Sequence, residues 1–218
     1  MDKWYEVPGK AGTNVIYSRV RLVRNLKEYP FPGRLTKEQS AELSEKLLGG
    51  LTGIASMDQM QYRFTHLERM GDLEKTALLE RRAINRSVIK KKDPTGMILS
   101  EDESTAILLN GDDHVRIQTL QTGLTLEQLY ERADKIDDYI SERFDYAFDE
   151  KYGYLTSFPT NVGTGLRAAV VLHLPMLSKN KNFNSLVADM GRFGTQVRGV
   201  YGEGAENFGS LYQISNQK

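Results

Sequence analysis

Five arginines stand in or beside segments that read as strands or tight loops, where a bound phosphate could reach them. They are Arg19, Arg21, Arg116, Arg167 and Arg198. Arg19 and Arg21 are two residues apart in VIYSRVRLVR (15–24), whose partial alternation is typical of a strand, so their side chains leave one face about 7 Å apart. Guanidinium groups at this spacing suit paired hydrogen bonds to successive phosphates. A solvated strand face would give the same pattern.

The segment NGDDHVRIQ (110–118) adds a carboxylate beside an arginine. With a strand period of two, the predicted faces are Asp112, His114, Arg116 and Gln118 on one side, and Asp113, Val115 and Ile117 on the other. The second set would face the core and the first a ligand. Cross-strand ion pairs on a solvent-facing strand are the alternative.

Two glycine-containing loops follow. TNVGTG (160–165) precedes Arg167, and QVRGVYGEGAENFG (196–209) carries Arg198 and Glu203. Such loops allow a close approach to a ligand and can close over it, although a turn or a mobile connection has the same composition.

The charge balance separates these arginines from a general basic surface. Lys+Arg number 29 and Asp+Glu number 29, which argues against nucleic acid or a membrane surface as a partner. An arginine cage around a polyphosphate is the economical interpretation, because phosphoryl transfer depends chiefly on positioning and electrostatics. Neither GxxxxGK[ST] nor an HRD/DFG set occurs, so the two commonest kinase architectures are excluded by motif.

The 218 residues suffice for one sizeable domain. There is no cysteine, no run of about 20 apolar residues and no signal-peptide core, which makes the cytoplasm the default location. No spacing of histidine or cysteine predicts a protein-held metal.

Strands are predicted to pair with one another rather than to alternate with helices. The predicted strands are 15–24, 60–66, a set within 97–121, 168–174, and short strands around the loop 196–209. The predicted helices are 37–48, with a Thr36/Gln39 capping box and a stop at Gly49–Gly50, 72–82, and 125–144 with a Thr125/Gln128 capping box. This order predicts an α+β fold with a largely antiparallel sheet flanked by helices.

Four segments, taken together, resemble the catalytic domain of the ATP:guanido phosphotransferases, the creatine and arginine kinase family, and within it the bacterial protein-arginine kinases. They are YSRVRLVRN, NGDDHVRIQ, YLTSFPTNVGTGLRA and RGVYGEG, in the family's order between about Val15 and Asn216. The resemblance implies a guanido kinase, or glutamine synthetase-like, catalytic domain over 1–218. It also implies that this domain lacks its last helices and the helical domain that precedes it in creatine and arginine kinases.

The resemblance also implies site residues and substrates. The catalytic carboxylates by position are Asp112 and Glu203, which would orient the guanidinium. The nucleotide-binding positions are Tyr17, Ser18, Arg19, Val20, Arg21, Arg116, Arg167, Ala168, Ala169, Val170, Val171, Arg198, Gly199, Val200, Tyr201, Gly202 and Glu203. ATP would bring Mg²⁺ held mainly through phosphates and water. The implied acceptor is arginine in a protein substrate; an activator protein and a homodimer are left open.

The chain departs from the family pattern at several positions. Gly111 and Asp112 replace paired glutamates, Phe158 replaces a reactive cysteine, and Arg82 stands near the place of a nucleotide-contacting histidine. Two main functions therefore stay open. One is phosphoryl transfer from ATP to a guanidinium nitrogen, and the other is a weakened or inactive nucleotide-binding paralogue that regulates a partner. Transfer to a free guanidino compound is a third.

Overall fold

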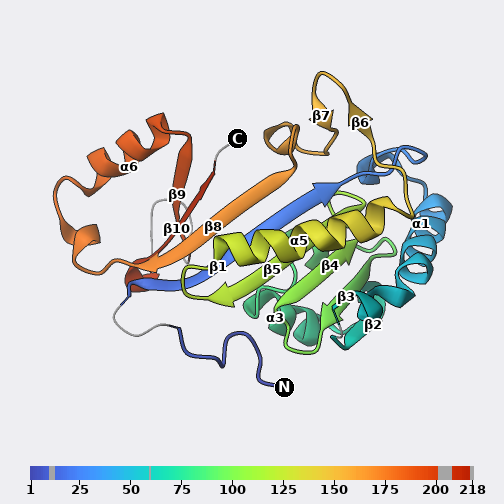
Figure 1. Ribbon diagram of the computed structural model, residues 1–218, viewed down its shortest axis with the longest axis horizontal. Coiled ribbons are helices and arrows are strands. Elements are labelled where there is room, and N and C mark those ends of the chain that lie inside the picture. Colours follow the sequence, from blue (N-terminus) through green and yellow to red (C-terminus); the bar gives the residue numbers. More distant parts are fainter. Residues whose placement is uncertain (10–12, 59, 201–207, 217–218) are drawn as a thin grey trace.

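The predicted antiparallel sheet is confirmed by a computed structural model, which describes residues 1–9, 13–58, 60–200 and 208–216. Within these residues, eight strands form one sheet in the order β2-β3-β4-β5-β1-β8-β10-β9, and all neighbours are antiparallel (Figure 1). The strands are β1 (Val15–Arg24), β2 (Tyr62–His66), β3 (Gly96–Ser100), β4 (Thr105–Leu109), β5 (Val115–Thr122), β8 (Leu166–His173), β9 (Thr195–Gly199) and β10 (Leu211–Asn216). A separate small ribbon pairs β6 (Phe148–Asp149) with β7 (Gly153–Tyr154).

The helices lie around this sheet. The α-helices are α1 (Lys37–Gly50), α2 (Ala55–Asp58), α3 (Asp72–Glu80), α4 (Arg86–Ile89), α5 (Leu126–Ser141) and α6 (Phe183–Arg192). Single 3₁₀ turns cover Pro32–Arg34, Thr52–Ile54, Leu67–Arg69, Pro159–Asn161, Leu177–Lys179 and Phe208–Ser210. The sequence predicted α1, α3 and α5 but not α6.

One face of the sheet carries the main apolar core. Helix α5 lies across this face (Figure 1), and its Ala133 and Ile136 are fully buried against Val20 and Ile117 of the central strands. Helix α1 extends the same core through Leu43. The long apolar stripe predicted for 125–144 is thus the side of α5 that faces the sheet.

The capping boxes and the helix stop predicted from the sequence can be compared with the observed ends of α1 and the observed start of α5. Thr36 and Gln39 form the predicted reciprocal capping box at the start of α1. The glycine pair does mark the end of α1, although the helix includes both glycines and ends at Gly50 rather than at 48. A side chain at Gly50 would collide with the ring of Phe144. The box predicted at Thr125 is wrong: no side chain caps α5 there.

On the opposite face of the sheet, the described residues form two separate apolar clusters. Helices α3 and α4 pack Leu78 and Val88 onto β3 and β4, which makes a second buried cluster with Leu108. A third cluster joins Trp4 to Tyr17 on another part of this face. The predicted arginines Arg21, Arg116, Arg167 and Arg198 line a cavity on this face.

Candidate functional site

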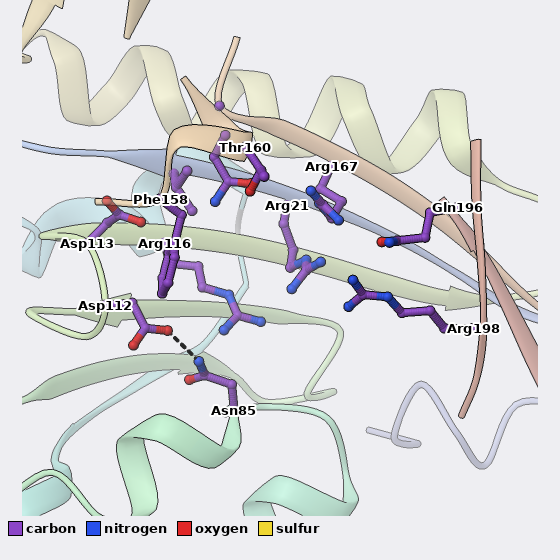
Figure 2. Close-up of a pocket in the computed structure, with 13 residues that line it drawn as sticks. Arg21, Asn85, Asp112, Asp113, Arg116, Phe158, Thr160, Arg167, Gln196 and Arg198 are labelled. Atoms are coloured by element: carbon purple, nitrogen blue, oxygen red, sulfur yellow. Dashed lines mark hydrogen bonds between the residues drawn. The ribbon is translucent and has the colours of Figure 1, made fainter. Parts of the chain in front are cut away.

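The five predicted arginines lie on one face of the sheet, spread over neighbouring strands, and we call this group the arginine lattice. Arg21 of β1 lies opposite Gln118 of β5 on one side and opposite Arg167 of β8 on the other. Arg116 follows on β5 and Arg198 on the edge strand β9. Residues paired directly across an antiparallel ladder share a face, so distant parts of the sequence deliver their guanidinium groups to one place (Figure 2).

A cavity of about 360 Å³ opens over this lattice. Its wall includes Arg21, Arg116, Arg167 and Arg198. Phe158 and two carboxylates, Asp112 and Asp113, lie at one end, and Gln196 and Arg198 at the other (Figure 2). Four of the five predicted arginines therefore line one cavity, and Arg19 is not among its lining residues. The sequence patterns missed Asn85, which also lines the cavity. Thr160, Asn161 and Gln196 line it too and belong to the two loops that were predicted to approach a ligand.

The lattice is short of counter-charges. Arg19 donates to Gln213 Oε1 at 2.6 Å, and Arg116 donates to Gln118 Oε1 at 3.0 Å. Across the described residues, none of the five arginines forms an ion pair with a carboxylate. The Nε atoms of Arg19 and Arg21 are buried and have no hydrogen-bond partner within the described part of the chain. Unpaired buried donors are costly, and an anion that accepts from them would remove the cost.

Burial and mutual repulsion both act on these guanidinium groups. Burial, followed by the charge of Arg19, lowers the pKa of Arg116 to about 10. The pKa of Arg21 lies well below its ordinary value, first because of burial and then because of Arg19 and Arg116. Burial and Arg198 lower the pKa of Arg167 in the same direction. All of these shifts are what a preformed anion site shows before its ligand arrives.

Asp112 is held at the end of the cavity by residues from another part of the chain. Asn85 Nδ2 donates to Asp112 Oδ2 at 2.7 Å, and Ser87 Oγ donates to the same oxygen at 3.0 Å. Both interactions use one carboxylate oxygen. No hydrogen bond to Oδ1 is found among the described residues, which leaves that atom for a ligand.

A side chain at Gly111 would crowd the side chain of Leu108. A Cβ there would lie 2.8 Å from Leu108 Cδ2 and 3.8 Å from Val88 Cγ2, so it would point at the cluster under α4. A longer side chain at this position would therefore not reach the cavity without moving the turn. Asp112 alone supplies the carboxylate of this pair of positions.

The strand pattern predicted for residues 112–114 is wrong. Strand β5 begins only at Val115, and the preceding residues form a hairpin loop in which Asn110 has φ 55°. Asp113, predicted to face the core, lines the cavity instead and is 2% exposed. Its Oδ1 accepts from Asn25 Nδ2 and from the main-chain N–H of Ser157.

His114, predicted on the ligand side, is fully buried beside the end of β1. Its Nδ1 accepts from the N–H of Leu26 at 2.9 Å, and its Nε2 lies 2.9 Å from the carbonyl of Pro30. These partners require a neutral ring protonated on Nε2. Burial lowers its pKa to about 4. His114 thus has a structural role: its hydrogen bonds to Leu26 and Pro30 hold the loop that carries Asp112.

Arg24 fastens the glycine-containing loop to the sheet. Its guanidinium binds Asp137 Oδ2 of α5 at 2.6 Å, donates to Thr164 O at 2.9 Å and lies 3.6 Å from the centre of the Tyr154 ring. Gly165 has φ 64° and no space for a Cβ beside Arg24. The loop therefore presents its cavity-lining residues from a fixed position.

The other residues predicted to bind the nucleotide lie partly on the face of the sheet that carries the arginines and partly on the face that α5 covers. Tyr17 and Val171 are buried in the cluster around Trp4, and Val200 packs against it. Ser18 and Val20 lie on the α5 face, where Ser18 Oγ donates to Gly123 O. In the paired register, Ala169 lies opposite Arg19, whereas Ala168 and Val170 lie opposite Val20 and Ser18.

Of the remaining residues predicted to bind the nucleotide, Gly199 lies in the edge strand β9. Gly199 pairs with Tyr212 in β9 and β10. Tyr201, Gly202 and the predicted catalytic Glu203 lie outside the described residues.

The structure thus combines an antiparallel sheet, an arginine-lined cavity and a carboxylate held at the end of that cavity. Residues 45–218 match the sequence model described as "ATP:guanido phosphotransferase, C-terminal catalytic domain". The chain therefore belongs to the ATP:guanido phosphotransferase family.

Relatives and solved structures agree with this assignment. The chain is 42% identical over 203 residues to a protein-arginine kinase of Clostridium kluyveri. This alignment covers 93% of this chain and 59% of the relative. It is 37% identical to one from Halothermothrix orenii, over 100% of this chain and 61% of the relative. The chain thus spans about 60% of the length of these curated relatives.

Two solved structures share the fold. The substrate-free duplicated taurocyamine kinase of Schistosoma mansoni aligns with a TM-score of 0.79 and 27% identity over 94% of this chain and 30% of that one. A lombricine kinase aligns with a TM-score of 0.79 and 24% identity, over 93% and 59% of the two chains, and supports the fold alone.

None of the helices in the described ranges is long and apolar enough to cross a membrane.

Proposed function

We propose that this chain transfers the γ-phosphoryl group of ATP to a guanidinium nitrogen, and that the acceptor is an arginine side chain in a protein. The observation that carries the proposal is the cavity in which arginines without a carboxylate partner among the described residues lie beside Asp112, whose Oδ1 accepts no hydrogen bond there. The relatives that are named protein-arginine kinases support the choice of acceptor. A guanidino phosphotransferase domain over residues 1–218, with a cytoplasmic location, stays a prediction from the sequence.

The arginines would act on the phosphates. Arg21, Arg116 and Arg167 come from three adjacent strands, so they can surround a phosphate chain and balance its charge without reorganisation. In the transfer, the terminal phosphorus exchanges its bond to the bridging oxygen of ADP for a bond to the acceptor nitrogen, which loses one proton. Arginines fixed before the ligand binds favour that change because they meet the charge where it develops.

Asp112 would act on the acceptor. A guanidinium carries only donors, and the Oδ1 of Asp112 offers an acceptor at the end of the arginine-lined cavity. Orientation is the main task, since the pKa of a free guanidinium lies above about 12. Glu203 remains the proposed second carboxylate, with its position outside the described residues.

Magnesium would arrive with ATP as part of the substrate. No group of three or more His, Cys, Asp or Glu side chains suited to a metal is found in the described residues, and Asp113 already accepts from Asn25 and Ser157. These residues fit an ion that is carried mainly by phosphate oxygens and water. Its contribution there would be to neutralise charge on the transferring group.

The test is to incubate the protein with Mg·ATP and an arginine-rich protein and to search for acid-labile phosphoarginine by mass spectrometry. The Asp112→Asn variant should lose about 100-fold or more in rate, whereas Asp138→Asn, on the exposed side of α5, should match the parent. ATP binding without any transfer at high protein concentration would instead support a regulatory nucleotide-binding module. Gly111, Phe158 and the single methylene of Asp112 are the features that keep that second candidate open.

A further inference from the structure

A second cavity meets the arginine-lined one at Asp112 and Phe158. It measures about 520 Å³ and shares these two residues with the first cavity. Its other walls are the turn Phe31–Arg34, the segment around Lys91 and Asp93, and Gly111. Figure 2 places Asp112 and Phe158 together at one end of the arginine lattice, so the second cavity continues outward from that end. We call it the entry trough.

The trough combines aromatic and apolar surface with carboxylates. Phe158 is 50% exposed and Phe31 and Pro32 are partly exposed, which offers rings and a proline to a ligand without any rearrangement. Asp93 and Asp112 supply two carboxylates. The Lys91 ammonium is bound to the carbonyl oxygens of Asn110 at 2.6 Å and Gly111 at 2.9 Å, so it supports the floor of the trough.

The junction at Asp112 decides what kind of molecule fits. A ligand that reaches Oδ1 of Asp112 through the trough meets a carboxylate, which favours a cationic donor at the inner end. The rest of that ligand would lie along Phe31, Pro32 and Arg34. A free guanidino compound would fill the inner end and leave the outer rings uncovered. A polypeptide with an arginine side chain fills both, because its main chain and flanking residues extend beyond the guanidinium.

We propose that the entry trough binds the acceptor polypeptide, with the arginine side chain passing Phe158 to Asp112 and an apolar neighbour of that arginine packing on Phe31 and Pro32. This inference rests on the proposed function and adds the substrate's binding surface and sequence preference. Its basis is the continuity of the two cavities together with the match between the carboxylate at the junction, Asp112, and a cationic side chain. Arginines flanked by leucine or phenylalanine are the preferred acceptors, and arginines flanked by glycine are poor ones.

The test compares acceptors in the parent and in two variants. Phe31→Ala removes a ring that lines the trough but not the arginine-lined cavity, and Phe193→Ala removes a ring that is 87% exposed and lines neither. Each protein is assayed for phosphoarginine formation on heptapeptides with a central arginine flanked by leucines or by glycines, and on free arginine. Thermal unfolding of each variant checks that it is folded.

Phe31→Ala should raise the KM for the leucine-flanked peptide about five- to tenfold, by loss of buried ring area, with less than a twofold change in the KM for ATP. The preference for that peptide over free arginine should fall by the same factor, and Phe193→Ala should behave as the parent. Equal losses for peptide and free arginine, or equal KM values for the two peptides in the parent, would overturn the trough as the acceptor surface.

A binding measurement separates this inference from the proposed function. A fluorescein-labelled leucine-flanked peptide is titrated with the parent in the presence of ADP and followed by anisotropy, with a lysine-centred peptide as the control. Binding that prefers arginine and weakens in Phe31→Ala supports the trough even where no transfer is detected. Transfer activity without such binding contradicts the trough and leaves the proposed function standing.

Discussion

Arg21 and Arg167 lie directly opposite each other in the antiparallel pairing of β1 and β8. Like charges at such paired positions repel, and here the pair adjoins Arg116 and a buried, unpartnered Nε of Arg21. This repulsion destabilises the folded protein in the centre of its sheet. The ligand-free protein is therefore less stable than it could be, and the cause lies where a polyanion would bind.

The first prediction concerns that conflict. Replacing Arg21 with glutamine removes one of the repelling charges, so the ligand-free protein should become no less stable, or slightly more stable. Stabilisation by ATP or tripolyphosphate should fall, since a ligand at 100 times its Kd adds about 2.7 kcal/mol only while it is bound. The measurement is the melting temperature with and without ligand.

Arg63→Gln is the control for this experiment, because Arg63 is an exposed arginine of the edge strand β2. It should keep the full shift with tripolyphosphate. A shift that is as large in Arg21→Gln as in the parent would show that the phosphates bind elsewhere.

The second prediction concerns His114. The folded protein holds this ring neutral with a pKa of about 4, whereas an unfolded chain has the ordinary value of about 6.5. Because the folded pKa is lowered, the stabilisation is complete above about pH 6.5 and is lost as pH falls toward 4. The loss amounts to about 3 kcal/mol. Urea unfolding between pH 4 and 7.5 measures it.

His114→Gln should be less stable than the parent at pH 7.5 but should lose less stability on acidification. His173→Gln replaces an exposed histidine at the end of β8 and should follow the parent. Lys91 also opposes protonation of His114. Parallel pH profiles for His114→Gln and the parent would mean that the buried ring does not control acid sensitivity.

The sequence predicted the sheet well because its signals are local and periodic. The alternation in 15–24 placed Arg19 and Arg21 on one face and Val20 and Leu22 on the other, as found. It predicted Asp112–His114 badly because the same alternation was extended across a hairpin loop. The left-handed φ of Asn110 breaks the period there, and the Asn-Gly pair at 110–111 is a sequence signal for such a turn.

Contacts between distant segments could not be predicted in this way. Asn85 binds a carboxylate 27 residues away, and no spacing connects the two positions. Helix α6 was missed for a different reason. Phe183, Leu186, Val187 and Met190 follow the helical period, so its sequence does carry a helix signal. What it lacks is a capping side chain at Asn182 and any buried residue.

The third prediction concerns Asn85 as a positioning residue for Asp112. Asn85→Ala removes the 2.7 Å hydrogen bond to Oδ2 and leaves Asp112 to Ser87 alone. The kcat for transfer should fall about 10- to 100-fold with little change in the KM for ATP, since a displacement of about 1 Å can cost about 100-fold. Ser87→Ala, which removes the longer contact, should cost less. A rise in the KM for ATP at constant kcat would assign Asn85 to the nucleotide instead.

The fourth prediction concerns the buried ion pair of Arg24 and Asp137, whose side chains are 4% and 9% exposed. Burial raises the pKa of Asp137 although Arg24 acts in the opposite direction, so the carboxylate depends on its partner. Arg24→Met should destabilise the protein by about 3–5 kcal/mol, because it leaves Asp137 buried without a counter-charge. Asp137→Asn should cost less, since the amide can still accept from Arg24.

The double variant, Arg24→Met with Asp137→Leu, decides whether the pair itself stabilises the fold. Replacing both charges should recover much of the loss, because desolvation of the two ions offsets their attraction. Transfer activity should stay low in the double variant even where stability returns, because Thr164 O loses its donor and the loop before Arg167 is released. Full recovery of activity with stability would show that Arg24 has no part in holding that loop.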